Sequence, residues 1–382
     1  MHRPAEIIPF DQKLRKSSAS RRTVHRGQGS TITVNCIGLG HWGPNLVQCF
    51  NSSERATVGT VCDLSDARLA MIRKRVSHKV RTSTDPVATA VDPKADAVVI
   101  STPTQTHFEL TKAALNAGKH VFVEKPLAGS LDEAEELVEL ANKQGRLLAV
   151  GHVFLFNNGI RAVKRLIDAG DLGRVLYMCA TRTNLGPIRG DCNALWDLGA
   201  HDISIFNYWL DADPQRVTAC GTSCLRPKIE DLVVANFFYP NNVQASVLAS
   251  WLSPKKVREI TVVGERQMVV WNDMDVDEPI RIYHKSVDIE RGPGYADNPS
   301  AHRMLVRSGE VIIPKIEQVP PLDNECQHFL DCLEGKCLPL NDGQVGLRVV
   351  RALAAAEQSL HDGSLLTRVP SPTGLTLFAK AA

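Results

Sequence analysis

The chain has 382 residues, of which 43% are hydrophobic and 23% are charged, and its formal net charge is +2. This length favours two domains, and the composition is ordinary for a globular protein. The small net charge gives no reason to expect a nucleic-acid partner, and the sequence contains no apolar run of about 18 residues that would predict a membrane span.

The first thirty residues form a basic segment that differs from the rest of the chain. Seven of them are Lys or Arg, and only Glu6 and Asp11 are acidic. The segment lacks the apolar stretch of a secretory signal. Arg and Ser with few acids also occur in transit peptides, but we predict a disordered tail or an upstream translation start. We therefore expect a cytoplasmic protein whose ten cysteines, which include no CxxC pair, are reduced and hold no metal.

Residues 31–43, TITVNCIGLGHWG, combine an apolar strand with a glycine-rich turn at Gly38, Gly40 and Gly43. A lone GxGxxG is a weak signal, because glycine clusters also make ordinary turns. Here a second strand, ATVGTVCD, ends at Asp63, twenty residues past the last glycine. At about this spacing a Rossmann fold places a carboxylate that hydrogen-bonds the adenosine ribose, while the glycines let the backbone approach a pyrophosphate.

Strands and helices continue to alternate as far as residue 150. Apolar strands are predicted at ADAVVIS, KHVFVEK and LLAVGH, and helices at DARLAMIRKRV, HFELTKAALNAG and SLDEAEELVELANKQG. This order predicts a parallel sheet with helices on both faces. We therefore interpret residues 31–150 as a dinucleotide-binding Rossmann domain. The alternative is a doubly wound domain without a cofactor.

Two segments follow strands of this sheet and are expected to face the cofactor, because ligands of open α/β sheets bind beyond the carboxyl ends of the strands. They are STPTQTH, residues 101–107, and the Glu-Lys-Pro sequence that ends KHVFVEKP. The residues predicted to contact the dinucleotide are Gly38, Gly40, His41, Trp42, Gly43, Asp63, Thr102, Pro103, His107, Glu124 and Lys125.

From residue 151 to residue 382 the alternation stops, and the pattern predicts a second, α+β domain. Strand-like runs separated by turns predict a large open, mostly antiparallel sheet. They lie at 174–184, 215–222, 231–239, 243–251, 257–264, 267–272 and 279–284, and helices are predicted at 157–173, 194–210, 323–335 and 343–363.

Within the second domain, Asp197 and His201 are four residues apart and would share one face of an α-helix. Taken alone, such a pair is most simply a structural hydrogen bond. Combined with a strand-end lysine in a cofactor domain, it is a catalytic candidate in which Asp197 orients His201, an imidazole whose ordinary pKa lies near neutral pH.

Candidate substrate-binding residues surround this helix. An arginine fork suits a diphosphate, although the same arginines could equally form surface ion pairs. The candidates are Arg182, Asn184 and Arg189 beside the helix, and Asn157 and Arg161 at the start of the second domain.

The segments IGLGHWG, STPTQTH, AALNAGKHVFVEKPLA and WDLGAHD together resemble the glucose-fructose oxidoreductase/inositol dehydrogenase/rhizopine catabolism (Gfo/Idh/MocA) family over roughly residues 31–370. The resemblance implies an NAD(P)-dependent dehydrogenase of sugars or cyclitols, with Lys125, Asp197 and His201 as its catalytic residues. It also implies a homo-oligomer, a dimer or tetramer, supported by the open sheet. The chain departs from the family at CNALWDLG, where many members carry a glycine-rich run.

Three longer segments are similar to a branch of nucleotide-sugar 3-dehydrogenases: GHWGPNL, TNLGPIRGDCNALWDLGAHDISI and WLSPKKVREITVVGERQMVVWNDM. This similarity implies oxidation of the C3 hydroxyl of a substrate such as UDP-N-acetylglucosamine or its uronic acid. A free sugar, an inositol or another polyol is the alternative substrate, and a catalytically silent dinucleotide-binding regulator is the alternative class.

The expected chemistry is hydride transfer from a sugar carbinol. His201 is our preferred base, and Lys125 would polarise the same oxygen, but the sequence leaves open an exchange of the two roles. We expect NAD rather than NADP as the cofactor, because the Asp63 carboxylate would repel a 2′-phosphate. Helical spacing predicts that the nearby Arg68 faces solvent.

Overall fold

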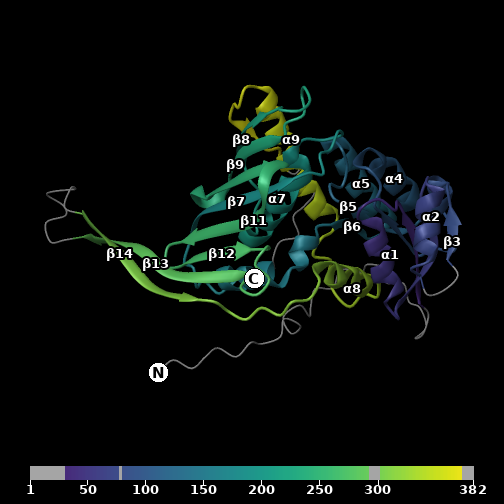
Figure 1. Ribbon diagram of the computed structural model, residues 1–382, viewed down its shortest axis with the longest axis horizontal. Coiled ribbons are helices and arrows are strands. Elements are labelled where there is room, and N and C mark those ends of the chain that lie inside the picture. The colour runs from purple at the N-terminus through teal and green to yellow at the C-terminus, as the bar shows by residue number, and fades with distance from the viewer. Residues whose placement is uncertain (1–30, 77–79, 292–301, 372–382) are drawn as a thin grey trace.

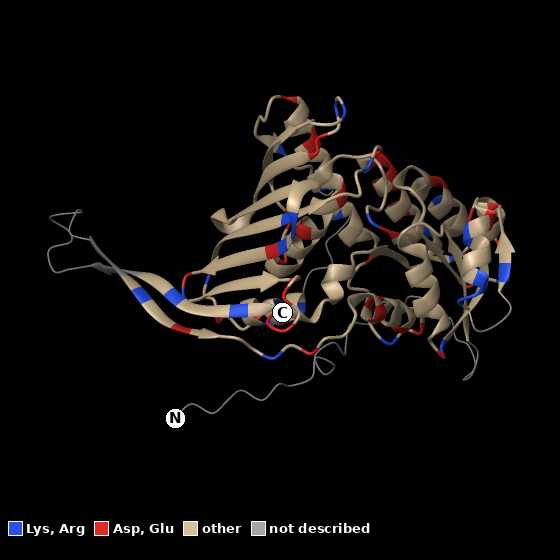
Figure 2. Ribbon diagram, in the orientation of Figure 1, with Lys and Arg blue, Asp and Glu red and all other residues tan. Residues whose placement is uncertain are grey.

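The computed structural model describes residues 31–76, 80–291 and 302–371, so the predicted basic tail lies outside the described residues. Two units lie side by side, each built on one sheet (Figure 1). The first sheet has six strands and the second has nine. Lys and Arg are interspersed with Asp and Glu over both units (Figure 2), in keeping with the small net charge.

The first unit is a parallel sheet in the strand order β3-β2-β1-β4-β5-β6, which confirms the predicted Rossmann topology. Its strands are β1 (Ile32–Ile37), β2 (Ala56–Cys62), β3 (Arg81–Ser83), β4 (Ala97–Ile100), β5 (His120–Glu124) and β6 (Leu148–Gly151). Its helices are α1 (Gly43–Asn51), α2 (Asp66–Arg73), α3 (Pro86–Ala90), α4 (His107–Asn116) and α5 (Leu131–Gln144). The sequence analysis did not assign β3 and α3, which are too short to carry a clear period.

The middle strands of this sheet are apolar on both faces because helices cover both. Val98, Val99, Val121 and Phe122 are fully buried. Their side chains divide between two hydrophobic clusters, one on each side of the sheet. This arrangement directs the carboxyl ends of β1, β2, β4, β5 and β6 to the same edge, where the glycine turn and the Glu-Lys-Pro segment lie.

The second unit is a nine-stranded sheet in the order β14-β13-β12-β11-β7-β10-β9-β8-β15. Only β10 and β7 run parallel, so the predicted mostly antiparallel sheet is confirmed. Its strands are β7 (Val175–Leu185), β8 (Arg216–Thr222), β9 (Leu232–Phe238), β10 (Gln244–Ser250), β11 (Leu252–Gly264), β12 (Met268–Asn272), β13 (Ile280–Arg291), β14 (His302–Ile312) and β15 (Thr367–Arg368).

The sequence analysis ended its last strand at residue 284 and assigned no strand β14. Strands β13 and β14 form a long hairpin that extends away from the body of the molecule (Figure 1). Val287 and Val306 pair across it and are 52% and 78% exposed. Ile280 and Ile282 at the start of β13 are buried, but this outer part of the hairpin is exposed and needs no clear hydrophobic alternation, so the pattern-based prediction failed there.

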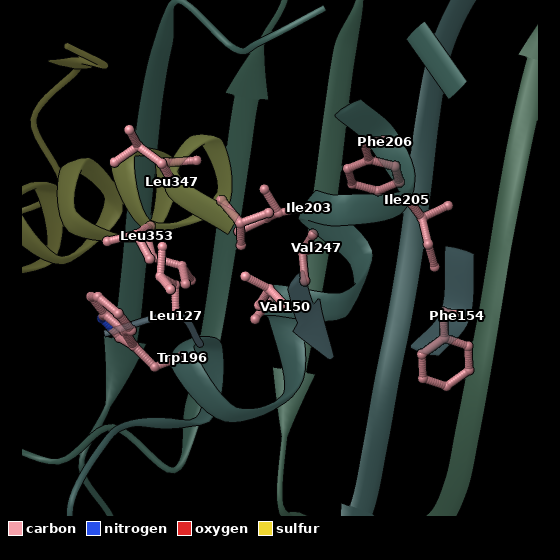
Figure 3. Packing of buried hydrophobic residues seen from close by; sticks show 14 of the residues in the cluster. Leu127, Val150, Phe154, Trp196, Ile203, Ile205, Phe206, Val247, Leu347 and Leu353 are labelled. Carbon is pink, nitrogen blue, oxygen red and sulfur yellow. The ribbon is translucent and has the colours of Figure 1, made fainter. Parts of the chain in front are cut away.

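One face of the second sheet is covered by helices α6 (Asn158–Asp168), α7 (Ala200–Leu210) and α9 (Gly343–His361). Alternate residues of β8, β9 and β10, among them Val217, Ala235 and Val247, are buried in the same hydrophobic cluster as these helices. Figure 3 shows Val247 near Ile203 of α7 and Val150 of the first sheet. The two units therefore share a core.

The last helices of the chain return to the first unit. Helix α8 (Pro321–Leu333) places Phe329 with its ring centroid 5.6 Å from Phe122 and 6.1 Å from Phe50. Arg55 pairs with Asp331 of α8 at 2.7 Å. The first sheet ends with β6 at Gly151 and the second begins with β7 at Val175, while helix α8 packs on the first sheet. The domain boundary at residue 150 stays a prediction. Among the described residues, no helix is both long and apolar enough to cross a membrane.

Replacing Phe329 by Ala should lower the free energy of unfolding by about 3–5 kcal/mol, because a fully packed aromatic ring is lost from the first core. Val276→Ala, at a residue that is 65% exposed, should change it by less than about 0.5 kcal/mol. Denaturant unfolding monitored by circular dichroism measures both. Equal stability of the two variants would mean that α8 does not stabilise the first unit.

Candidate active site

The glycine turn after β1 has the shape that a dinucleotide needs. Gly38 has φ +95°, and a Cβ there would lie 2.7 Å from the backbone of Ser101. A Cβ on Gly43 would lie 2.0 Å from the Gly38 oxygen, so the turn tolerates glycine alone at both positions. Gly40 is exposed and faces open space, and the amino end of α1 has no side-chain cap. These residues fit a pyrophosphate at a helix amino terminus.

The side chains of His41 and Trp42 are exposed at the tip of this turn, with their rings in an edge-to-face contact. Asp63 lies behind the turn, where its carboxylate accepts hydrogen bonds from the Leu39 N–H at 2.7 Å and the Ser65 N–H at 2.8 Å. Arg68 does not simply face solvent as expected, because its guanidinium is 3.6 Å from the Asp63 carboxylate. Asp63 therefore holds the turn in shape as well as standing at the end of β2.

The segment after β4 differs from its prediction at His107. Thr102 is half-buried and Pro103 is exposed near the glycine turn. His107, however, is buried, and its ring nitrogens lie 2.9 Å from the carbonyl oxygens of Pro126 and Thr102. Both ring nitrogens therefore face protein groups, and His107 connects two loops instead of offering a side chain to a cofactor.

Lys125 follows β5 and spans the gap between the two units. Its ammonium donates to the backbone oxygen of Asp197 at 2.6 Å and lies 3.3 Å from the Asp197 carboxylate. The Lys125–Pro126 peptide bond is cis. Both side chains are largely shielded, with 9% and 15% of their surfaces exposed. The structure thus brings together two of the three predicted catalytic residues, which are 72 positions apart.

The predicted link between Asp197 and His201 takes a different form. Asp197 lies in a π-helical turn, Leu195–Gly199, that precedes α7. Its carboxylate is directed to Lys125 and to Arg189, at 3.3 Å from each, and among the described residues it makes no hydrogen bond to His201. The local backbone is wider than the assumed α-helix, and the carboxylate has two cations to pair with, so Asp197 orients Lys125 rather than His201.

His201 begins the first turn of α7 and packs edge-to-face against Phe154, with ring centroids 4.9 Å apart. Withdrawal from water lowers its pKa well below the usual value, and the positive charges of Lys125 and Arg182 lower it further. The imidazole is therefore neutral at neutral pH and can accept a proton. The sequence analysis had expected a pKa near neutrality, because burial and neighbouring cations are tertiary effects.

A second histidine at this edge was missed by the sequence analysis. His152 follows β6 and is completely buried, and neither ring nitrogen has a partner among the described residues. Burial and the nearby Lys125 lower its pKa to about 3. An unpaired buried imidazole is costly and calls for a ligand or a functional explanation. Its place at the carboxyl end of the strand predicted at LLAVGH was the available signal.

Glu124 lies beside Lys125 but faces the sheet. A Cβ on Gly151 of β6 would lie 2.9 Å from its carboxylate, so glycine leaves the space that Glu124 occupies. Burial raises the pKa of Glu124 to about 7, against the opposing charge of Lys125. Glu325 of α8 is also buried, and burial together with Glu124 raises its pKa well above the usual value. Two carboxyl groups thus lie behind the lysine in an apolar setting.

Arg182 is not available as the predicted diphosphate ligand. Its guanidinium makes two 2.8 Å hydrogen bonds to Asp202, and their side chains are 3% and 1% exposed. It also stacks over the ring of Phe154, with 4.5 Å from the guanidinium carbon to the ring centroid. Arg182 therefore supports the ring against which His201 packs.

The other predicted substrate residues separate into two groups. Asn157 caps α6 by accepting from the N–H groups of Gly159 and Ile160, and Arg161 donates to the Leu155 carbonyl. Asn184 donates to the carbonyl of Gly186. These three contacts are structural. Arg189 alone lies in the site, between Asp191 at 2.6 Å and Asp197, and hydrogen bonding to Asp191 raises its pKa, so it stays charged.

Arg182→Met should lower the free energy of unfolding by about 3–5 kcal/mol, because it leaves the Asp202 charge buried without a partner. The double variant Arg182→Met/Asp202→Leu should recover most of that loss, since both charges are removed. Denaturant titration of the three proteins tests this. A single variant of unchanged stability that binds UDP more weakly would instead restore the diphosphate role.

The stability difference between the wild type and His152→Asn should depend on pH. Because the pKa of His152 is lowered in the folded state, the unfolded state takes up a proton between pH 6.5 and about 3 that the folded state does not. The wild type therefore loses stability relative to the variant as the pH falls through this range. The free energy of unfolding of the wild type minus that of the variant should fall by up to about 1.4 kcal/mol for each pH unit of acidification. Parallel unfolding curves at every pH would contradict the prediction.

Comparison with known proteins identifies the family of both units. Residues 32–152 match the model described as "Oxidoreductase family, NAD-binding Rossmann fold", and residues 160–270 match "GFO/IDH/MocA C-terminal domain". UDP-N-acetylglucosamine 3-dehydrogenase of Acidithiobacillus ferrooxidans is 28% identical over 330 residues, which are 84% of this chain and 95% of that protein. scyllo-Inositol 2-dehydrogenase (NAD(+)) of Bacillus subtilis is 31% identical over 237 residues, 58% of this chain and 68% of that protein.

Among solved structures, the WlbA dehydrogenase of Bordetella pertussis in complex with NADH and UDP-GlcNAcA has a TM-score of 0.74 at 21% identity, covering 90% of this chain and 99% of that one. At this identity the likeness concerns the fold. The family models and the curated relatives together identify the protein: the chain belongs to the Gfo/Idh/MocA family of oxidoreductases, with an NAD-binding Rossmann domain.

Proposed function

We propose that this protein is an NAD-dependent dehydrogenase that oxidises a secondary hydroxyl of a sugar, namely C3 of a UDP-linked sugar. The observation that carries the chemistry is the Lys125–Asp197 pair just after β5, near His201, whose pKa burial and the charge of Lys125 lower. The substrate is inferred from the relative named UDP-N-acetylglucosamine 3-dehydrogenase, which matches this chain over nearly its own full length.

In the proposed mechanism the side chains accept the hydroxyl proton and stabilise the charge on the substrate oxygen. Bound NAD would supply the hydride acceptor. His201, neutral because of burial and nearby cations, accepts the hydroxyl proton, and the Lys125 ammonium stabilises the charge that develops on the oxygen. Asp197 holds Lys125 in place through a contact at 3.3 Å. The pairing supports this division of roles, since among the described residues Lys125 has a carboxylate partner and His201 has none.

Asp63 supports a preference for NAD over NADP. Its carboxylate is fixed at the end of β2 by two backbone N–H groups, and a 2′-phosphate placed beside it would meet a negative charge. Arg68 is close enough to weaken that repulsion in part, at 3.6 Å from the carboxylate. We therefore expect a preference for NAD rather than an absolute exclusion of NADP.

A free polyol is the second candidate substrate. The relative named scyllo-inositol 2-dehydrogenase is 31% identical, slightly above the UDP-N-acetylglucosamine enzyme, but over 58% rather than 84% of this chain. The broader match supports the nucleotide sugar. Arg189, a charged guanidinium that borders the Lys125–Asp197 pair, is the residue that we assign to the diphosphate.

Lys125→Met and His201→Asn should each lower kcat about 10²–10⁴-fold, the range expected for loss of a positioned proton-transfer or charge-stabilising group. Reduced-nicotinamide absorbance, followed with UDP-N-acetylglucosamine and NAD⁺ or NADP⁺, measures the rates. Circular dichroism verifies that each variant is folded. Folded variants with wild-type rates would remove both residues from the mechanism.

Arg189→Gln should raise KM for UDP-N-acetylglucosamine at least about tenfold, because the diphosphate loses a charge-assisted contact. UDP should inhibit the wild type and inhibit the variant more weakly. Arg174→Gln, which removes an exposed ion pair with Glu265, is the matched control. Turnover of myo-inositol or another free polyol as fast as any UDP-sugar, without inhibition by UDP, would favour the second candidate.

The homo-oligomer and the cytoplasmic location remain predictions. The face of the second sheet opposite α7 and α9 supports the former, because half-buried Val234 and Leu248 lie on it in adjacent strands. Apolar side chains on an open sheet favour contact with another protein surface.

A further inference from the structure

A cluster of two cysteines and a histidine lies at the end of α8, away from the residues assigned to catalysis. His328 and Cys332 are one turn apart on the helix, and the chain then reverses through Gly335, at φ +72°, and returns Cys337 to them. The Cys332 and Cys337 sulfurs are 3.5 Å apart, and each is 3.5 Å from a ring nitrogen of His328. All three side chains are half-buried.

A backbone contact decides the protonation of His328. The N–H of Leu340 donates to Nε2 at 2.9 Å, so Nε2 is an acceptor. Burial lowers the pKa of the ring to about 4, and a neutral imidazole that accepts at Nε2 carries its proton on Nδ1. Nδ1 faces the Cys337 sulfur. Burial raises the pKa of the Cys332 thiol, whereas Cys337 has a hydrogen-bond donor aimed at its sulfur, so Cys337 is the better placed nucleophile of the pair.

The same three groups would suit zinc by residue type. The Leu340 contact argues against that use. Coordination through Nδ1 would move the proton to Nε2, where it would meet the Leu340 N–H, and coordination through Nε2 would displace this N–H. The arrangement is therefore better suited to a thiol pair than to a metal.

We propose that Cys332 and Cys337 form a reversible disulfide by exchange with a low-molecular-weight disulfide such as oxidised glutathione, and that its formation loosens the backbone contact that supports β6 behind the active site. The sulfurs must approach by about 1.5 Å to reach bonding distance. Cys337 lies in a turn outside α8, so a small movement of that turn brings the sulfurs together.

The exchange has two steps. The Cys337 thiolate attacks one sulfur of glutathione disulfide, the S–S bond breaks, and one glutathione thiolate leaves and takes a proton. Cys332 then loses its proton and attacks the Cys337 sulfur of the mixed disulfide, which releases the second glutathione. The two cysteines lose two electrons in total, and one glutathione disulfide becomes two glutathiones.

The route to the active site is short. The N–H of Leu340 donates a hydrogen bond to His328, and the next residue in the chain is Asn341. The Asn341 carbonyl accepts from the Val150 N–H at 2.8 Å, and its side-chain N–H group donates to the Val150 carbonyl at 2.7 Å. Val150 lies in β6, two residues before His152. Moving Cys337 towards Cys332 disturbs the turn that contains Leu340. The hydrogen bond from the Val150 N–H to the Asn341 carbonyl then weakens, and the Val150 amide exchanges its hydrogen faster.

The test uses the full-length protein in glutathione buffers of increasing oxidised fraction, followed by acid quenching, alkylation, trypsin digestion and mass spectrometry. Because Lys336 lies between the cysteines, the disulfide should appear as two peptides joined by a bond with the loss of two hydrogens. Cys332→Ser and Cys337→Ser should abolish this species. Cys220→Ser/Cys224→Ser, at two exposed positions, should leave it unchanged, and His328→Asn should slow its formation severalfold.

Amide hydrogen exchange, which needs no substrate, measures the second part. Oxidation should speed exchange at Val150 in the wild type but not in Cys332→Ser, while peptides of β1 stay unchanged. No linked peptide in the most oxidising buffer, while Cys220 and Cys224 react, would overturn the proposal. One equivalent of bound zinc that is lost in Cys337→Ser would overturn it in favour of a metal site. A disulfide without faster exchange at Val150 would overturn the link to β6.

Discussion

The contact between the Lys125 ammonium and Asp197 is the interaction on which the site depends. It joins the end of a strand in one sheet to a turn that precedes a helix on the other, across 72 positions of sequence. An isolated ion pair at a surface would contribute little. Here both partners are largely shielded, and a 2.6 Å bond to the Asp197 backbone fixes the lysine independently of the carboxylate. The relative position of the two units therefore sets the geometry of the candidate catalytic groups.

The packing around this contact explains the protonation of its neighbours. His201, His152 and Glu124 all lie where water is excluded, and in each the neutral form is favoured. The same low-polarity surroundings strengthen the Lys125–Asp197 attraction. Arg182 acts on His201 indirectly. It forms a buried ion pair with Asp202 and stacks on the ring of Phe154, and His201 packs against that ring. The polar groups at the site are thus held by buried side chains and not by flexible surface loops.

Helix α8 gives the first unit a second connection to the end of the chain. Phe329 fills its core, Arg55 pairs with Asp331, and Glu325 lies close enough to Glu124 to raise its own pKa. Asn341 continues this connection by bonding to both carbonyl and amide of Val150. A change at the end of α8 can therefore reach the edge of the sheet where His152 lies, without passing through the solvent-exposed part of the site.

The sequence by itself determined the Rossmann order, the glycine turn, the position of Asp63 and the placement of Lys125 at a strand end. These features depend on short-range patterns: apolar runs of strand length, glycines where a Cβ would collide, and polar residues after buried strands. The parallel sheet with helices on both faces followed from them, because alternating strands and helices leave few ways to cover both faces. The part of the β13–β14 hairpin beyond residue 284 escaped prediction because its exposed residues carry no core-facing period.

Only the tertiary structure decided what each polar side chain does. Arg182 and Arg189 are both arginines beside the same helix, yet one is buried against Asp202 and the other borders Asp197. His107 and His152 both follow strands of the first sheet. The ring nitrogens of His107 lie within hydrogen-bond distance of two carbonyl oxygens, whereas those of His152 have no partner within the part of the chain that the structure describes. Sequence patterns record local periodicity, whereas burial, pairing and pKa depend on groups brought together from distant parts of the chain, and these contacts exist only once the chain has folded.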